Sequence, residues 1–376
     1  MGLRVDPQDI RLALGARGGV AVDLPALLPA SLVLELAGED LRSRLYFASA
    51  PDGTELCLRA DLTIPAALRF IEERPALPVA WLHEGKVFRA PRDGEGGGSE
   101  FVQVGLERYG DADPVAADCD VVLAALEACA AGGLTQPVLT LSDGDLVRDL
   151  LARADLPEPW ASSLRSVAGN PRALRQRMAE AAGAVPLPEP GALDKALIGL
   201  ASEEAEAAVE EVLALSRLSL GPGRSAADVM RRLVGKARRA LAEPMDPAVL
   251  AVIGRLLGVE GPARPAIDAV VAAARDLGVD VSAWAAGWMA RLDALAASAP
   301  AAAAGAVFRA GRSRNFAYYS GLFFDVAADA AALPAASGGR YDGLLAALSD
   351  GAVDQPAVGC VVRPNRLHGP AAGRGA

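Results

Sequence analysis

The sequence is poor in the residues that most often carry catalysis or hold metal ions. Its 376 residues include only two histidines, His83 and His368, too few for a histidine-based catalytic or metal-binding constellation. The four cysteines lie far apart and form no CxxC pair: Cys57, Cys119, Cys129 and Cys360. This scatter predicts free thiols in a reducing cytoplasm and argues against a zinc site. We therefore expect a cytoplasmic protein without a metal or other cofactor.

Lysine and long apolar runs are also scarce. Three lysines occur, and the formal net charge is −10. A protein that grips RNA or DNA needs a basic face that displaces counterions from phosphates, so we expect no nucleic-acid partner. No apolar stretch reaches the length that crosses a bilayer, and the N-terminal MGLRVDPQDIRLAL lacks the apolar segment of a signal peptide. These absences predict a soluble protein.

The first structural unit is predicted between residues 20 and 70. A short helix is expected near Ser31–Leu36, and the strands RLYFAS and ELCLRA flank PDG, which is strong turn chemistry. A helix begins at Thr63, with Thr63 as its candidate N-cap and Pro65 in the first turn. Asp61 and Thr63 follow a strand where the chain turns, a common place for binding residues. Helix capping and ligand binding are equally good explanations of these two residues.

The stretch 80–110 reads as strand, loop and strand. FVQVGLERY alternates apolar and polar residues, which indicates a strand with one buried face. Paired with AWLHEGKVFR, it would place Arg89, Gln103 and Glu107 on one face, where they could hold a small zwitterion. An ordinary surface hairpin is the alternative. The glycine-rich loop between the strands opens no helix, so it predicts a flexible loop and not a phosphate cradle.

The rest of the chain alternates helical and strand patterns. A helix is predicted over Ala112–Ala131, followed by the strand PVLTLSD. Residues 145–262 read as amphipathic helices. Within them, residues 151–262 contain 14 basic and 14 acidic residues, which is unlike a module that binds RNA. A long helix through RPAIDAVVAAARDLGV then leads to an alanine-rich stretch at 295–306. The strands AVFRA and GLFFDVAA follow, and GGRYDGLLAAL predicts a glycine turn and a helix.

Several of these segments resemble class II aminoacyl-tRNA synthetases, and histidyl-tRNA synthetase in particular. VFR, a loop and FxQxGxExxG resemble motif 2, and LRADLT and NFAYYSGLFFDV resemble two histidine-recognition segments. SGGRYDGLL and PAVGCVVRPNRL resemble the third segment and motif 3. The resemblance implies an α+β fold, a class II synthetase-like antiparallel sheet flanked by helices. It also implies a core of residues 1–144 and 263–376, a helical insertion at 145–262, no anticodon-binding domain, and a homodimer formed through motif 1.

The same resemblance implies a histidine-binding pocket. In the synthetases an acidic residue and a threonine hold the amino group of the ligand, a tyrosine at the place of Tyr319 bonds the imidazole, and an arginine at the place of Arg314 neutralises the carboxylate. Here the aspartate expected three residues after Arg314 is Ala317, which weakens a catalytic pose for that arginine. The predicted ligand-binding residues are Asp61, Thr63, Arg89, Gln103, Glu107, Arg314, Tyr318 and Tyr319.

The departures from the synthetase pattern fall on the nucleotide side. A motif 2 glutamate that seats ATP is replaced by Pro91, and the motif 2 loop is acidic where basic residues are expected. In motif 3 a glycine that lies flat against adenine is replaced by Arg363, whose side chain would occupy the space of the ring, and Asn365 replaces the glutamate. We expect no catalytic residue and no adenylate formation.

A retained amino-acid pocket beside a dismantled ATP site is typical of a sensor or scaffold. The chain resembles the non-catalytic paralogues of histidyl-tRNA synthetase, the regulatory subunits of ATP phosphoribosyltransferase. Membership implies activation of a short-form catalytic subunit, a hetero-oligomer, and histidine as feedback effector in the first step of histidine biosynthesis. A truncated or free-standing histidine-activating enzyme is the alternative, and an amino-acid-binding dimer with another partner is a third reading.

Overall fold

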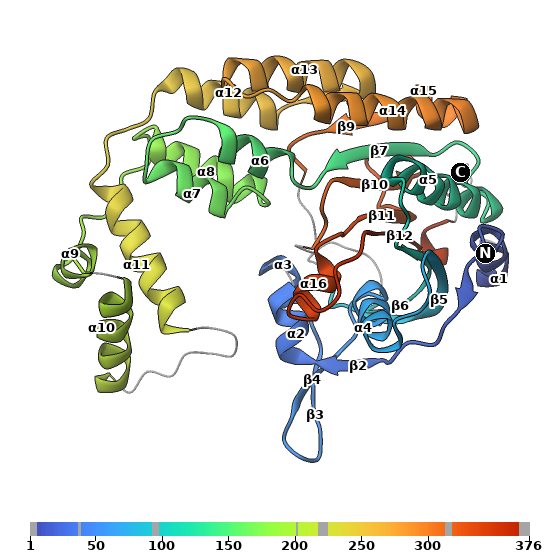
Figure 1. Ribbon diagram of the computed structural model, residues 1–376, viewed down its shortest axis with the longest axis horizontal. Coiled ribbons are helices and arrows are strands. Elements are labelled where there is room, and N and C mark those ends of the chain that lie inside the picture. Colours follow the sequence, from blue (N-terminus) through green and yellow to red (C-terminus); the bar gives the residue numbers. More distant parts are fainter. Residues whose placement is uncertain are drawn as a thin grey trace, which may run out of the picture.

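The protein is built on one large sheet, seen in the middle of Figure 1. The computed structural model describes residues 6–36, 39–91, 98–200, 202–216, 225–312 and 318–367. Within these residues nine strands form the sheet, antiparallel except where β1 pairs with β5 and β7 with β9. Across the sheet the order is β1 (Val20–Ala21), β5 (Val79–Phe88), β6 (Glu100–Tyr109), β12 (Ala357–Val362), β11 (Ala336–Arg340), β10 (Leu322–Ala327), β7 (Val138–Asp143), β9 (Val307–Arg309) and β8 (Glu260–Pro262).

The predicted hairpin over residues 80–110 is confirmed as β5 and β6. The two strands pair from Val79 opposite Tyr109 to Phe88 opposite Glu100. Side chains alternate between the two faces of a strand. The odd-numbered residues of both strands, which include Trp81 and Gln103, therefore lie on one face of the pair, and the even-numbered residues lie on the other. The glycine-rich part of the connecting loop, residues 92–97, lies outside the described residues.

Helices cover the two faces of the sheet and divide the core. On one face, α1 (Pro7–Gly15), α5 (Pro114–Ala131), α13 (Ala263–Asp276) and α14 (Ser282–Ser298) bury their apolar sides against the strands. On the other, α4 (Thr63–Glu73), α2 (Ala30–Leu36) and α16 (Leu344–Leu348) pack around Trp81 and Tyr109. Short elements complete this part: α3 (Glu39–Arg42), α15 (Pro300–Ala304) and the 3₁₀ turn η1 (Pro364–Arg366).

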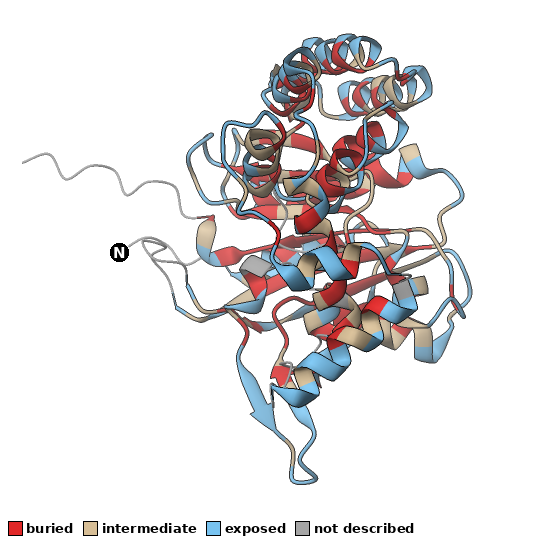
Figure 2. Cartoon of the chain, turned by 90° about the vertical axis from the view of Figure 1, so that its left-hand side faces the viewer, coloured by how far each residue is buried: buried red, intermediate tan, exposed pale blue. Residues whose placement is uncertain are grey.

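A small second sheet projects from the body beside α2. It has the order β2 (Leu27–Pro29), β4 (Glu55–Leu58) and β3 (Phe47–Ser49), and it contains the hairpin predicted around PDG. All three residues of β3 are exposed, and Phe47 keeps 55% of its surface accessible. The hairpin is the pale blue projection at the bottom of Figure 2.

The described residues between Leu146 and Leu257, where the sequence predicts the insertion, are mainly helical. They bury two clusters of their own, one around Trp160 and Ile253 and one around Val209 and Met230. The division into domains stays a prediction; the strand β8 at Glu260–Pro262 already belongs to the large sheet. The helices are α6 (Leu146–Arg153), α7 (Trp160–Ser166), α8 (Pro171–Ala181), α9 (Ala192–Ile198), α10 (Ser202–Leu215), α11 (Ala226–Ala240) and α12 (Pro247–Leu257). None of the described helices is long and apolar enough to span a bilayer.

Two local predictions are wrong in part. The expected long helix is divided into α13 and α14. Between them Gly278 has a φ of 72°, which is incompatible with a right-handed helix and ends α13. In GGRYDG the first two glycines form no turn, because Gly338 and Gly339 lie inside β11, whereas Gly343 lies in the predicted turn before helix α16. A Cβ at Gly338 would lie 2.4 Å from the carbonyl oxygen of Gly359 and 2.7 Å from the ring of Phe324. These glycines therefore allow close packing within the sheet.

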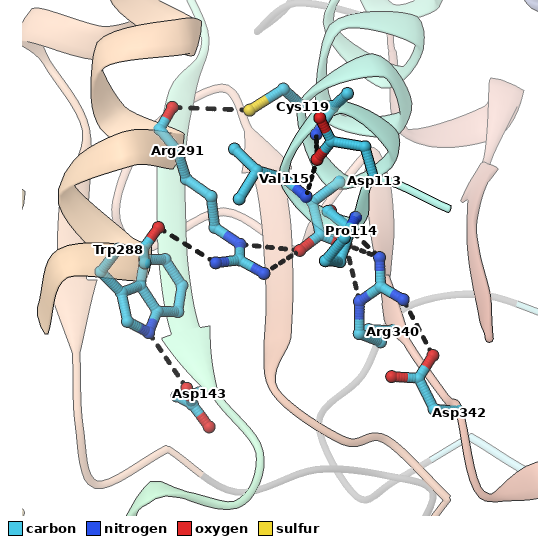
Figure 3. Close-up of polar contacts among 12 residues, drawn as sticks. Asp113, Pro114, Val115, Cys119, Asp143, Trp288, Arg291, Arg340 and Asp342 are labelled. Carbon is cyan, nitrogen blue, oxygen red and sulfur yellow. Dashed lines mark hydrogen bonds and ion pairs between the residues drawn. The ribbon is translucent and has the colours of Figure 1, made fainter. Parts of the chain in front are cut away.

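A buried ion cluster ties α5, α14 and β11 together, and Figure 3 shows its surroundings. The Asp118 carboxylate is fully buried and accepts hydrogen bonds from Arg291 at 2.7 Å and from Arg340 at 2.7 and 3.0 Å. Burial raises the pKa of Asp118, against the opposing effect of the two guanidinium groups. The carboxylate thus fixes a helix from each half of the chain to the sheet.

Candidate functional site

The β5–β6 hairpin forms the floor of the candidate site. Glu107 and Gln103 lie on the face of β6 that α4 covers, and His83 lies on the same face of β5 because it pairs with Gly105. Arg89 follows the end of β5 in the same alternation, and its backbone N–H donates to the carbonyl of Ser99 at 2.8 Å. The predicted placement of Arg89, Gln103 and Glu107 on one face is therefore confirmed.

The Glu107 carboxylate is the centre of the site. It is 1% exposed. The Thr63 hydroxyl donates to Oε1 at 2.8 Å, and His83 Nε2 lies 3.3 Å from the same oxygen. The Tyr341 hydroxyl donates to Oε2. These partners come from α4, β5 and the turn after β11, so the carboxylate joins segments from both ends of the chain.

A glycine on the neighbouring strand gives this carboxylate its space. Gly359 on β12 pairs with Glu107, and a Cβ added there would lie 1.6 Å from Glu107 Oε2. Any larger residue at this position would displace the carboxylate or push the strands apart. The glycine of PAVGCVV thus has a role in the geometry of the site.

Asp61 and Thr63 both face the site, and the predicted N-cap role of Thr63 is wrong. The helix α4 has Leu62 at its N-cap position without a side-chain bond, while Asp61 Oδ1 accepts the backbone N–H of Ile64 at 3.2 Å. The Thr63 hydroxyl is used by Glu107 instead. Asp61 Oδ2 accepts a hydrogen bond from the Tyr318 hydroxyl at 2.7 Å. Burial raises the pKa of Asp61, and the bond from Tyr318 opposes the shift.

Gln103 is buried without a partner. It is fully inaccessible, and neither its Oε1 nor its Nε2 has a hydrogen-bond partner among the residues that the structure describes. The Nδ1 atom of His83 is in the same condition. A buried amide without partners costs about 1–3 kcal/mol. The amide of Gln103 and Nδ1 of His83 could therefore form hydrogen bonds with a ligand, because the described residues provide no partners for them.

Two arginines bring positive charge to the other end of the site. Arg89 Nε donates to the carbonyl of Ala60 at 2.5 Å, and its guanidinium lies 5.5 Å from the centre of the Phe101 ring. Burial, and then the charge of Arg363, lowers the pKa of Arg89 to about 10. Asp61, which follows Ala60 in the chain, and Glu107 supply negative charge in the same site. A zwitterion, which carries both signs of charge, matches this composition.

The structure brings most of the predicted residues together. Tyr319 packs against Tyr318 with ring centres 4.9 Å apart, and burial raises its pKa, as do the nearby charges of Glu107 and Asp61. Arg314 lies outside the described residues. The assignment of a ligand to these side chains stays a prediction. No described group of three or more histidine, cysteine, aspartate and glutamate side chains is arranged to hold a metal ion.

The sequence reading missed His83 and Tyr341. His83 stands two residues from Trp81 in the alternation of β5, so its position on the buried face could have been found once the register with β6 was known. Tyr341 lies within GGRYDG, the segment interpreted as a turn. Their contacts with Glu107 depend on strand pairing, which local sequence patterns do not report.

Comparisons with known proteins agree on one family. The family model for histidyl-tRNA synthetase matches residues 13–219 and 209–367. An ATP phosphoribosyltransferase regulatory subunit of Sinorhizobium medicae is 34% identical over 367 residues, covering 95% of this chain and 94% of its own. A protein of the same description from Sinorhizobium fredii is 32% identical over 356 residues, covering 92% and 91%.

Solved structures show the same fold at lower identity. A Bacillus halodurans protein described as an ATP phosphoribosyltransferase regulatory subunit/histidyl-tRNA synthetase has a TM-score of 0.63 and 20% identity, covering 96% of this chain and 76% of its own. A histidine–tRNA ligase subunit of Alicyclobacillus acidocaldarius has a TM-score of 0.52 and 21% identity, covering 96% and 92%. The predicted class II synthetase-like fold is confirmed. The chain belongs to the ATP phosphoribosyltransferase regulatory subunits of the histidyl-tRNA synthetase family.

Proposed function

We propose that this chain activates a short-form ATP phosphoribosyltransferase catalytic subunit and transmits feedback inhibition by histidine. In this role it performs no chemistry of its own. It forms a homodimer within a hetero-oligomer, binds histidine between Glu107 and Arg89, and acts in the first step of histidine biosynthesis. The names of its relatives support the regulatory role.

One observation supports the proposal: the described residues that the resemblance assigns to the amino acid lie together, while residues that it assigns to the nucleotide are replaced. Glu107, Asp61 and the unpartnered Gln103 offer acceptors and an amide to an ammonium and an imidazole. At the other end Arg363 is buried where the family places a glycine. A site that binds an amino acid without ATP can sense its concentration and cannot activate it.

The activation is tested by assaying the catalytic subunit with and without this chain. We expect the two proteins to co-elute and the phosphoribosyltransferase rate on ATP and phosphoribosyl pyrophosphate to rise when both are present. Regulation of this kind is a population shift with a coupling of about 1–3 kcal/mol, so histidine should then lower the rate between several-fold and about a hundredfold. An unrelated protein at the same concentration is the control. Separate elution and an unchanged rate would contradict the proposal and favour an amino-acid-binding dimer with another partner.

The enzyme alternative makes a different prediction. Without a nucleotide site, the purified chain should neither exchange pyrophosphate with ATP in the presence of histidine nor charge histidine tRNA. The residues that motivate this are Pro91, Arg363 and Asn365. A histidyl-tRNA synthetase assayed in parallel provides the positive control, and exchange clearly above the rate without histidine would establish the activating enzyme.

A further inference from the structure

Arg363 is a buried cation whose hydrogen bonds all go to neutral atoms. The residue is 6% exposed. Its Nη1 donates to the Ser337 hydroxyl at 3.0 Å and to the carbonyl of Pro334 at 3.4 Å. Among the described residues, Nε and Nη2 have no hydrogen-bond acceptor and no carboxylate forms an ion pair with this guanidinium. One edge of the group is therefore left for something other than the chain.

Two other buried arginines of the chain have more partners than Arg363. Arg340 pairs with Asp118 at 2.7 Å and with Asp342 at 2.9 Å, and Arg59 donates to three backbone carbonyls. An ion that is buried without a counter-charge costs several kcal/mol, because the lost hydration is not replaced. A bound anion would supply Arg363 with the counter-charge that the described residues do not provide.

Further positive charge surrounds Arg363. Arg366 Nη1 donates to the same Pro334 carbonyl, at 3.2 Å, so two guanidinium groups share one neutral oxygen. Burial, and then the charge of Arg366, lowers the pKa of Arg363 to about 10. Arg363 in turn depresses the pKa of Arg89. The strand register agrees: Val362 pairs with Val104, so Arg363 follows opposite Gln103, on the face that holds Phe101 and the guanidinium of Arg89 over its ring. A single anion there could interact with more than one cation.

The strand register places this charge on the face of the sheet that holds the candidate site. Gly359 pairs with Glu107, and the alternation along β12 carries that face through Val361 to Arg363. Tyr318 and Tyr319 also act on the pKa of Arg363, so the guanidinium lies near the predicted ligand residues. The uncompensated charge borders the pocket.

We propose that Arg363 and Arg89 form an oxyanion subsite beside the pocket, which binds a carboxylate or a phosphate group. Guanidinium groups hold both kinds of oxyanion through paired N–H donors. The carboxylate could belong to the bound amino acid, and a phosphate would be a separate ligand. The first source rests on the proposed histidine function, and the second does not.

The test is calorimetric titration of the full chain with three ligands. Histidine carries the side chain and the carboxylate, histidinol carries the side chain with a hydroxymethyl group in place of the carboxylate, and inorganic phosphate carries the oxyanion alone. The variants are Arg363→Met, Arg363→Lys and, as a matched control, Arg275→Met on the exposed face of α13. Since Arg363→Met removes an uncompensated charge, we expect its melting temperature to stay the same or to rise. Arg363→Lys provides a second variant that keeps the charge.

Each outcome decides the proposal. If the carboxylate of the amino acid fills the subsite, Arg363→Met weakens histidine binding about tenfold to a hundredfold and leaves histidinol binding unchanged. Phosphate then competes with histidine but not with histidinol. If a separate anion fills it, Arg363→Met weakens phosphate by a similar factor and changes neither amino-acid ligand. Arg363→Lys should lose less, and Arg275→Met nothing.

The subsite is refuted when Arg363→Met leaves all three affinities unchanged, or when histidine and histidinol weaken equally and phosphate binding does not change. Failure of histidine to bind the wild-type chain is a different result. It would remove the proposed ligand of the pocket, while the phosphate titration would still decide whether the arginines form an anion site.

Discussion

Replacing Glu107 with glutamine is expected to abolish histidine inhibition of the assembled complex. The carboxylate lies at the centre of the site, with the donors of Thr63, His83 and Tyr341 around it. A glutamine has the same shape but no charge, and its amide nitrogen cannot accept a hydrogen bond. A hydrogen bond to a charged group is worth about 1.5–3 kcal/mol, so histidine binding should weaken about tenfold to a hundredfold.

The measurement is the phosphoribosyltransferase rate of the complex as histidine is added, together with calorimetric titration of the free chain. Glu84→Gln is the matched control, because Glu84 lies on the same hairpin with its side chain exposed on the other face of β5. Melting curves establish that both variants fold. Inhibition of the Glu107→Gln complex at the wild-type histidine concentration would move the effector site away from this pocket.

The largest effect on stability is expected from Asp118→Asn. Asparagine keeps the shape of the side chain but leaves Arg340 and Arg291 without their buried counter-charge. Breaking a buried ion pair by removing one partner costs about 3–5 kcal/mol. The free energy of unfolding, measured in urea, should fall by this amount in the variant.

Asp120→Asn supplies a control on the same helix. Asp120 accepts hydrogen bonds from Arg17 and Arg108, but a quarter of its side chain is exposed to water. A partly solvated pair of this kind contributes about 1 kcal/mol or less. If the free energy of unfolding fell equally in the two variants, burial of Asp118 would not strengthen its ion pairs. The cluster would then not be what fixes α14 to the sheet.

The hairpin could be predicted from the sequence because its signal is local. Alternation in FVQVGLERY places Gln103 and Glu107 on one face whatever the rest of the chain does. The role of Thr63 could not be read in this way. A threonine before Ile-Pro at a helix start is typical of an N-cap, and its hydroxyl points to Glu107 only because β6 lies under α4.

The positions of Tyr341 and Arg363 show the same limit. Resemblance located both segments, but the first was interpreted as part of a glycine turn. Strand β11, which ends just before Tyr341, follows from close packing of Gly338 and Gly339 against β10 and β12. That Arg363 is buried with only neutral partners depends on the fold of Pro334 and Ser337 around it. Contacts of this kind are properties of the assembled sheet.

The hydrogen bond between Glu107 and Tyr341 has a consequence for the chain during its synthesis. Its partner Tyr341 follows 234 residues later, and at about 5–20 residues per second a ribosome needs on the order of 10–50 s to make the interval. Until β12 emerges, β6 is an open strand edge next to a carboxylate that lacks its tyrosine. The first half of the chain therefore carries an unpaired strand edge until almost the whole polypeptide has been translated.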